Sequence, residues 1–272
     1  MLAQRVLTAL LLAPLAILII LLLPTPWFAV VGAAVFLGAL EEWARLAGVR
    51  QAGGRIALLL VAVVLFALLW FAHAGPLTTL LLVLGVAWWL LACVWLGRFA
   101  FAAAPTPENR ALKLVAGAFV MFPAWMAVIA LHGREPHGHW WMLLALIIVW
   151  AADIGAYFSG RRFGKRKLAP QISPGKTRAG AYGALVAGVL VALVGGWLLG
   201  VRGTAMPGLA VLAVFTVAAS IVGDLLESLM KRHAQVKDSG TIFPGHGGLL
   251  DRLDSVFAAL PVFALGLWLL GL

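Results

Sequence analysis

A short segment near the end of the chain gathers many of the groups that could do chemistry. Residues 237–254, KDSGTIFPGHGGLLDRLD, contain two cations, three aspartates, one histidine and four glycines, although only 11% of the chain is charged. Asp251 and Asp254 are three residues apart, a spacing that places both carboxylates on one face of a helix. Glycines let a backbone approach a ligand closely and offer N–H groups to phosphate oxygens. The segment therefore predicts a site for phosphate or for a divalent cation.

A second polar segment, residues 159–180, carries seven cations. Its SPGKT stretch is similar to the end of a phosphate-binding P-loop, but that motif needs a glycine at position 170, where the chain has proline, and a preceding strand. We therefore reject the P-loop and keep a simpler prediction. Lys176 is a point charge for phosphate, and the hydroxyls of Ser173 and Thr177 lie beside it. The basic run 161–167 is more simply explained as a solvated loop.

The elements that must position these residues are transmembrane helices. The chain is 64% hydrophobic, and its apolar runs are continuous, without the alternation of a membrane β-barrel. We expect an all-α integral membrane protein with about nine transmembrane helices and no soluble domain. We also expect the first run to be a retained helix, because it is long enough to span and no cleavage site follows it. The predicted spans are 6–23, 27–47, 56–73, 77–96, 112–131, 140–160, 180–200, 207–230 and 250–271.

The basic residues are distributed unevenly between the two sides that nine spans define. Eighteen of the twenty Lys and Arg residues fall on one side, and only Arg134 and Arg202 fall on the other. The positive-inside rule then predicts a cytoplasmic N-terminus and an outside C-terminus in the cytoplasmic (inner) membrane. The net charge of +10 is explained by topology, so no nucleic-acid partner is expected. The single Cys93 excludes an intramolecular disulfide and a multi-cysteine metal site.

Two further aspartates are expected at membrane depth. Asp224 is seven residues before Lys231, and Asp153 is eight before Arg161, which puts both carboxylates roughly 10–12 Å below the cytoplasmic surface. Buried ionisable groups are functional candidates, although each aspartate alone could equally form an internal ion pair that fixes helix register. Several carboxylates at one depth need a cation between them. Oxygen ligands without thiolates favour Mg²⁺.

Two glutamates at the end of the second span have a simpler interpretation. Glu41 and Glu42 lie close to Arg45. We expect them to form ion pairs at the membrane interface, with the alternative that one of them lines the cavity.

The polar segments together resemble a known family. From Ser228 onward, SLMKRHAQVKDSGTIFPGHGGLLDRLD is similar to the signature of the phosphatidate cytidylyltransferases, also called CDP-diacylglycerol synthases. The resemblance extends upstream through GDLLES, SPGKT and ADIGAYFSGRRFGK, and it covers roughly the C-terminal half. One departure is Ala179, where the family usually has an acidic or amide side chain, so we place no ligand there. The matched signature positions are Ser228, Lys231, Arg232, Lys237, Asp238, Gly240, His246, Gly247, Gly248, Asp251, Arg252 and Asp254.

The resemblance implies a reaction between CTP and phosphatidate that gives CDP-diacylglycerol and pyrophosphate, with Mg²⁺ as cofactor in one or two copies. It implies a homodimer, a scaffold in residues 1–135 and an active site in 136–272. It also implies that Asp224, Asp251 and Asp254 are the metal ligands. The implied catalytic residues are these three aspartates with Lys231 and Arg252. The implied substrate-binding residues are Asp153, Ser173, Lys176, Thr177, Ser228, Arg232, Lys237, Asp238, His246, Gly247 and Gly248.

Two alternatives remain at this point. A multi-pass transporter could use buried aspartates, but it would usually show paired repeats and polar groups reachable from both sides. A CDP-alcohol phosphatidyltransferase would carry a D-G-x2-A-R run, which the sequence lacks. An enzyme with its site near the cytoplasmic face is therefore favoured.

Overall fold

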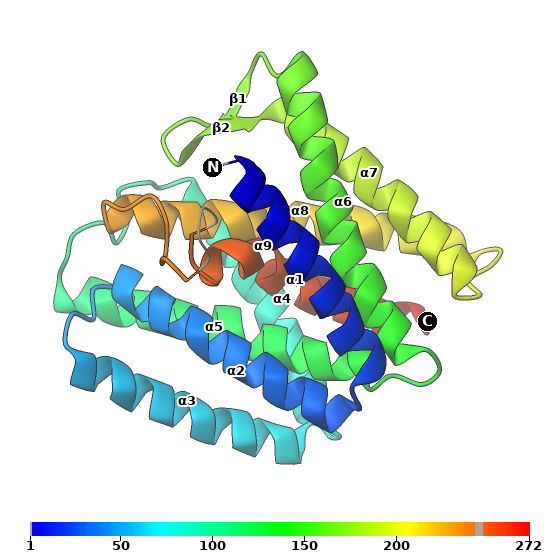
Figure 1. Cartoon of the computed structure of the whole chain (residues 1–272), viewed down its shortest axis with the longest axis horizontal. Coiled ribbons are helices and arrows are strands. Elements are labelled where there is room, and N and C mark those ends of the chain that lie inside the picture. Colours follow the sequence, from blue (N-terminus) through cyan, green and yellow to red (C-terminus); the bar gives the residue numbers. More distant parts are fainter. Residues whose placement is uncertain (1, 243–246) are drawn as a thin grey trace.

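A computed structural model describes residues 2–242 and 247–272 of the chain. Within these residues the chain forms nine helices and a two-stranded antiparallel sheet (Figure 1). Helices α2 to α9 are each long and apolar enough to cross a membrane, and the described part of α1 adds a shorter apolar stretch. The helices are α1 Leu2–Leu22, α2 Thr25–Leu46, α3 Ala52–Ala72, α4 Pro76–Leu96, α5 Pro107–His132, α6 Gly138–Phe163, α7 Arg178–Leu198, α8 Ala205–His233 and α9 Leu250–Leu270.

These helices confirm the predicted all-α membrane fold: a helix covers each of the nine predicted spans, and eight of them, α2 to α9, are long and apolar enough to cross a membrane. The largest differences are at helix starts, and at α5 a local cap explains the extension. Helix α5 begins at Pro107, five residues before the expected start of its span. The Thr106 hydroxyl caps it by accepting a hydrogen bond from the Asn109 N–H at 3.2 Å, and proline is well suited to the first helical position.

The basic segment between α6 and α7 differs from its prediction as a loop. Strand β1 (Lys167–Ala169) pairs with strand β2 (Ser173–Thr177), with Lys167 opposite Thr177 and Ala169 opposite Ser173. The SPGKT stretch is therefore a strand of a hairpin rather than a phosphate-binding loop. Antiparallel pairing satisfies backbone groups in a segment that Pro170 and Pro174 prevent from being helical.

The outer surface of the molecule is apolar, as a lipid-facing surface must be. Large hydrophobic side chains are exposed along α3, α4 and α7, including Phe71, Leu90 and Leu198. Such a surface would cause association in water, but lipid chains can cover it. The core lies between α5 and α9, where Met121, Phe257 and Phe263 are fully buried.

Helices α6 and α7 pack very closely through small residues. A Cβ atom at Gly155 would lie 2.5 Å from the Gly183 carbonyl oxygen and 2.7 Å from the Ala187 Cβ. Gly155 and Ser159 on α6 face Gly183 and Ala187 on α7, each pair at a spacing of four. This small-residue pattern is typical of tight helix pairs in membranes. The α6–α7 pair carries the β-hairpin at its upper end in Figure 1.

Most of the connections between helices lie at two opposite ends of the view in Figure 1. The α2–α3, α4–α5 and α8–α9 connections lie at the left of Figure 1, and the α5–α6 and α7–α8 connections lie at the right with the C-terminus. For these connections the arrangement agrees with the alternation used to count basic residues. The described part of the signature segment between α8 and α9 lies at the same end as the α2–α3 and α4–α5 connections, whereas the basic β-hairpin between α6 and α7 lies at the top of the view.

Candidate active site

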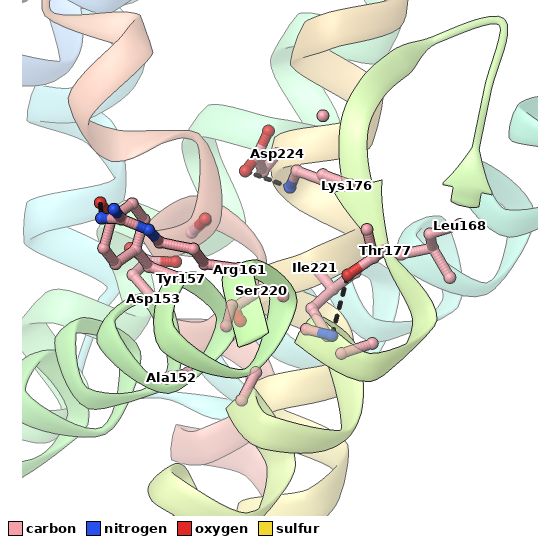
Figure 2. Close-up of a pocket in the computed structure, with 17 residues that line it drawn as sticks. Ala152, Asp153, Tyr157, Arg161, Leu168, Lys176, Thr177, Ser220, Ile221 and Asp224 are labelled. Atoms are coloured by element: carbon pink, nitrogen blue, oxygen red, sulfur yellow. Dashed lines mark hydrogen bonds and ion pairs between the residues drawn. The ribbon is translucent and has the colours of Figure 1, made fainter. Parts of the chain in front are cut away.

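A cavity of about 450 Å³ lies between α6, the hairpin, α7, α8 and the start of α9 (Figure 2). Its size falls within the usual range for small-molecule sites, about 300–1,000 Å³. The charged residues that line it are Asp153 and Arg161 from α6, Lys176 from β2 and Asp224 from α8. The structure thus brings two of the predicted carboxylates to one place, together with the predicted phosphate-binding lysine.

Lys176 and Asp224 form an ion pair across the cavity, drawn as a dashed line in Figure 2. Both side chains are about one-quarter exposed (25% and 28%), so a ligand in the cavity can reach them. The position of Lys176 depends on the junction between β2 and α7. There Thr177 ends the strand and caps α7, because its Oγ1 accepts a hydrogen bond from the Gly180 N–H at 3.1 Å. The Thr177 hydroxyl therefore has a structural role beside its predicted contact with substrate.

A close contact between α8 and α9 sets the position of Asp224. A Cβ atom at Gly223 would overlap the Asp254 carbonyl oxygen and would lie 2.9 Å from the Ala258 Cβ. Glycine at this position lets the two helix backbones touch, which brings Asp224 and the backbone of Asp254 together. Ser255, the residue after Asp254, lines the cavity. The Asp254 Oδ1 accepts a hydrogen bond from the Ser255 N–H at 2.6 Å.

A second cluster of charges surrounds Lys231. The Lys231 Nζ lies 2.6 Å from the Asp251 Oδ1 and also pairs with Glu227 one turn earlier on α8. Glu227 is only 2% exposed, and neither of its carboxylate oxygens makes a hydrogen bond of normal geometry within the described residues. The mostly buried Lys231 side chain is thus held between two carboxylates. Its charge compensates for theirs, which would be costly to bury without a partner.

The remaining oxygen of Asp251 is used within the signature segment. Asp251 Oδ2 accepts hydrogen bonds from the Ser239 N–H at 2.9 Å and from the Gly248 N–H at 2.7 Å, and it lies 2.8 Å from the Ser239 Oγ. Both carboxylate oxygens of Asp251 therefore have protein partners. The Gly248 N–H, which we predicted to bind phosphate, is engaged by Asp251.

The three predicted metal ligands divide between two clusters. No group of three or more acidic, His or Cys side chains that could hold a metal ion occurs within residues 2–242 and 247–272. Asp224 lines the cavity with Asp153, whereas Asp251 belongs to the Lys231 cluster. Mg²⁺ is commonly bound by one or two carboxylates together with substrate phosphates. The oxygen donors at the cavity therefore fit Mg²⁺, and those of Asp251 are occupied by N–H, hydroxyl and ammonium donors.

The other predicted residues surround these two clusters. The Arg232 Nε donates to the Ile172 carbonyl at 3.2 Å and so ties α8 to the hairpin, and the Ser228 Oγ lies 3.4 Å from the Asp224 Oδ1. Ser173 begins β2 at the far end of the strand from Thr177.

The remaining residues that the sequence singled out differ in their positions. His246 lies outside the described residues, and Gly247 packs against Asp251. Ala179 lines a separate groove on the outer face of α6 and α7, away from the cavity. Lys237, Asp238 and Arg252 are exposed.

Glu42 is the residue that the sequence interpretation missed. Glu41 forms the expected ion pairs with Arg45 and with Arg55, the latter at 3.0 Å. Glu42 was predicted to do the same, but it is completely buried (0% exposed) and forms no ion pair within the described residues. The sequence contained a pattern that indicates this difference. Glu42 is three residues after Ala39 and four before Leu46, so it lies on the same apolar face of α2, which is buried.

Comparison with known proteins points to one family. The chain matches the model of the family described as "Cytidylyltransferase family" over residues 3–270. It is 45% identical to a phosphatidate cytidylyltransferase of Pseudomonas aeruginosa, over 100% of this chain and 98% of that protein. It is 39% identical to a phosphatidate cytidylyltransferase of Haemophilus influenzae, over 97% of this chain and 98% of that protein.

A more distant match involves a shorter alignment. A phosphatidate cytidylyltransferase of Bacillus subtilis is 40% identical over 133 residues, about half of each chain. The similarity to the first two relatives, in contrast, extends across the N-terminal helices, beyond the C-terminal half to which the signature resemblance was limited. This chain is a multi-pass membrane enzyme that belongs to the phosphatidate cytidylyltransferase family.

Proposed function

We propose that this chain transfers the cytidylyl group of CTP to phosphatidate, giving CDP-diacylglycerol and pyrophosphate for phospholipid synthesis. The observation that carries the proposal is the cavity in which Lys176, Asp224 and Asp153 meet, in a chain whose relatives are named for this activity. A phosphate-binding cation and carboxylates at one site suit a reaction between two phosphate-bearing substrates.

The chemistry needs no protein nucleophile. A phosphate oxygen of phosphatidate attacks the α-phosphorus of CTP, the bond from that phosphorus to the bridging oxygen breaks, and pyrophosphate leaves with the bond electrons. The protein acts mainly by holding the two substrates in line and by neutralising charge. Lys176 and Arg161 at the cavity are candidate phosphate-binding cations. Further candidates, taken from the signature, are Lys231, Arg232, Lys237 and Arg252.

We also propose that the reaction depends on Mg²⁺, held by Asp224 with Asp153 and Asp254 nearby, and with Asp251 acting from the neighbouring cluster. When bound, Mg²⁺ would neutralise charge on the triphosphate and stabilise the leaving pyrophosphate. The oxygen-only donor set at the cavity supports this cation. The number of ions, one or two, depends on how many phosphate oxygens the nucleotide adds to the carboxylates.

The proposed location is the cytoplasmic (inner) membrane, with the active site on the cytoplasmic side. The uneven distribution of basic residues supports this orientation. In this orientation CTP would reach the cavity from the cytoplasm, and the phosphatidate headgroup would lie at the level of the cavity. The homodimer implied by the family resemblance stays a prediction.

An assay with purified protein in detergent tests the function. Pyrophosphate release and CDP-diacylglycerol formation are measured with CTP, phosphatidate and Mg²⁺, and again with each component omitted in turn. We expect product only in the complete mixture and not with diacylglycerol in place of phosphatidate. Movement of a substrate across proteoliposomes without product formation would instead support the transporter alternative.

A further inference from the structure

The buried carboxylate of Glu42, on α2, binds a segment of chain about 200 residues away. Its Oε1 accepts a hydrogen bond from the Leu249 N–H at 2.9 Å, and its Oε2 accepts one from the Leu250 N–H at 2.8 Å. Its Oε2 also lies 2.7 Å from the Ser239 Oγ. Two parts of the connection between α8 and α9, Ser239 and the residues at the start of α9, are thus attached to one side chain of the N-terminal half.

The location of these contacts explains how a carboxylate can be fully buried there. The N–H groups at the start of a helix have no partner within the helix, and the helix dipole favours negative charge at that end. Helix α9 begins at Leu250, so Glu42 satisfies two of its free N–H groups. Charge-assisted hydrogen bonds of this kind are stronger than neutral ones.

Two glycines of the signature segment pack directly against this carboxylate. A Cβ atom at Gly240 would overlap the Glu42 Oε1, and one at Gly248 would overlap the Glu42 Oε2. Two of the signature glycines therefore leave the space that the Glu42 carboxylate fills. The absence of a side chain at these two positions therefore has a packing reason, separate from any contact with phosphate.

A short chain of contacts connects Glu42 to the charged groups near the cavity. The Ser239 Oγ lies between Glu42 Oε2 and Asp251 Oδ2, at 2.7 and 2.8 Å, and its single proton can serve only one of them at a time. Asp251 in turn holds Lys231 at 2.6 Å. One turn after Asp251, Ser255 lines the cavity.

The position of Glu42 is itself rigid. The next residue, Trp43, is 2% exposed, and its indole N–H donates to the Lys113 carbonyl at 2.7 Å, which ties the end of α2 to α5. On the other side, a Cβ atom at Gly38 would lie 2.8 Å from the Leu249 Cδ2, so α2 also packs against the start of α9. Glu42 thus presents its carboxylate from a fixed point of the core.

We propose that Glu42 is a positioning residue for cytidylyl transfer: it holds the α8–α9 connection and the first turn of α9, so that Asp251 and Lys231 are presented to the substrates. The inference rests on the proposed function, because it gives the signature segment its role in that reaction. Glu42 acts through Ser239 and the α9 backbone and does not itself touch the reacting atoms.

The test compares Glu42→Gln with Glu41→Gln. Glutamine has almost the same shape, but its NH₂ group cannot accept a hydrogen bond, so at least one of the contacts to Leu249, Leu250 or Ser239 is lost. We expect Glu42→Gln to lower kcat by about 10- to 100-fold, the scale expected when reacting groups are slightly misplaced, with little change in thermal unfolding. We expect Glu41→Gln, which changes only ion pairs at the surface of α2, to keep parental kcat within about twofold.

Two further measurements separate positioning from loss of folding. Ser239→Ala removes the hydroxyl that lies between Glu42 and Asp251, and it leaves both backbone contacts of Glu42 and the Ser239 N–H bond to Asp251. Its effect on kcat should not add to that of Glu42→Gln, since both act through one contact chain. Amide hydrogen exchange in residues 237–252 should be faster in Glu42→Gln while the exchange of α5 is unchanged.

The outcomes distinguish this inference from the proposed function. An inactive parent protein overturns both. An active parent combined with parental kcat and parental exchange in Glu42→Gln overturns the inference alone. A loss of activity that matches a general loss of folded protein, with faster exchange in α5 as well, also overturns it.

Discussion

Lys176 and Asp224 pair with each other across the cavity, although the sequence assigned one to phosphate and the other to a metal ion. The pair joins β2 to α8, and thus the α6–α7 unit to the α8–α9 unit that carries the signature segment. Each side chain is in a position to exchange its partner for a charged group of the substrate. Both side chains are partly exposed, so the pair contributes little stability by itself.

Replacing Asp224 should therefore affect activity much more than stability. We expect Asp224→Asn to lower kcat by on the order of 10²–10³-fold, the scale seen when a group that stabilises transition-state charge is removed. The measurement is CDP-diacylglycerol formation at saturating CTP. Arg166→Ala, in the exposed basic segment, is the matched control and should remain close to the parent. Asp251→Asn, assayed beside it, tests the second cluster, and full activity in both Asn variants would refute the assignment of these carboxylates.

Lys176 should act mainly on the binding of CTP. Lys176→Ala removes a charge-assisted contact, which is worth about 1.5–3 kcal/mol. We expect the KM for CTP to rise by about 10- to 100-fold, with a smaller change in the KM for phosphatidate. Initial rates measured over a matrix of both substrate concentrations give the two constants. Equal changes in the KM for CTP and the KM for phosphatidate would argue against a specific contact with the nucleotide.

The contact between α8 and α9 at Gly223 should tolerate no side chain. Gly223→Ala places a methyl group against the Asp254 carbonyl and the Ala258 side chain, and overpacking of this kind costs about 1–3 kcal/mol. We expect lower thermal stability and lower activity together, because Asp224 and Asp254 are forced apart. Gly53→Ala is the control, since a Cβ atom there meets nothing within 4 Å. Unchanged thermal unfolding in Gly223→Ala would show that α8 and α9 are farther apart than described.

Removal of divalent cations should stop the reaction reversibly. With oxygen donors at the cavity, we expect a chelator to abolish product formation and Mg²⁺ to restore it. In Asp153→Asn the Mg²⁺ concentration for half-maximal rate should rise, because one cavity carboxylate is lost. Full activity after exhaustive chelation would exclude the proposed cation.

The orientation can be tested by labelling single cysteines in a Cys93→Ala background. Gln51 lies in the α2–α3 connection and Thr204 in the α7–α8 connection, and both are exposed. A membrane-impermeant maleimide added to intact cells should label Thr204→Cys, and should label Gln51→Cys only after the cells are broken. The reverse pattern would place the active site on the outer side of the membrane.

The sequence alone determined the features that depend on local composition. Each span was visible because about twenty apolar residues are needed to cross a bilayer. The helix ends differed by a few residues, at α5 because the Thr106 cap extends the helix beyond its apolar run. The signature residues were visible because their types and spacing are dense enough to recognise. The hairpin of β1 and β2 was missed because its pairing depends on where α6 and α7 place its two ends.

Only the tertiary structure decided which charged groups meet. Helix rotation, set by small-residue contacts such as Gly155 with Gly183 and Gly223 with Ala258, placed Asp224 at the cavity and Asp251 in a separate cluster. The same packing turned Glu42 inward, to donors 197 to 208 residues away, while Glu41 stayed at the surface. Hydropathy gives the position of a residue along the membrane normal, but the partner of a buried carboxylate depends on which helix faces it.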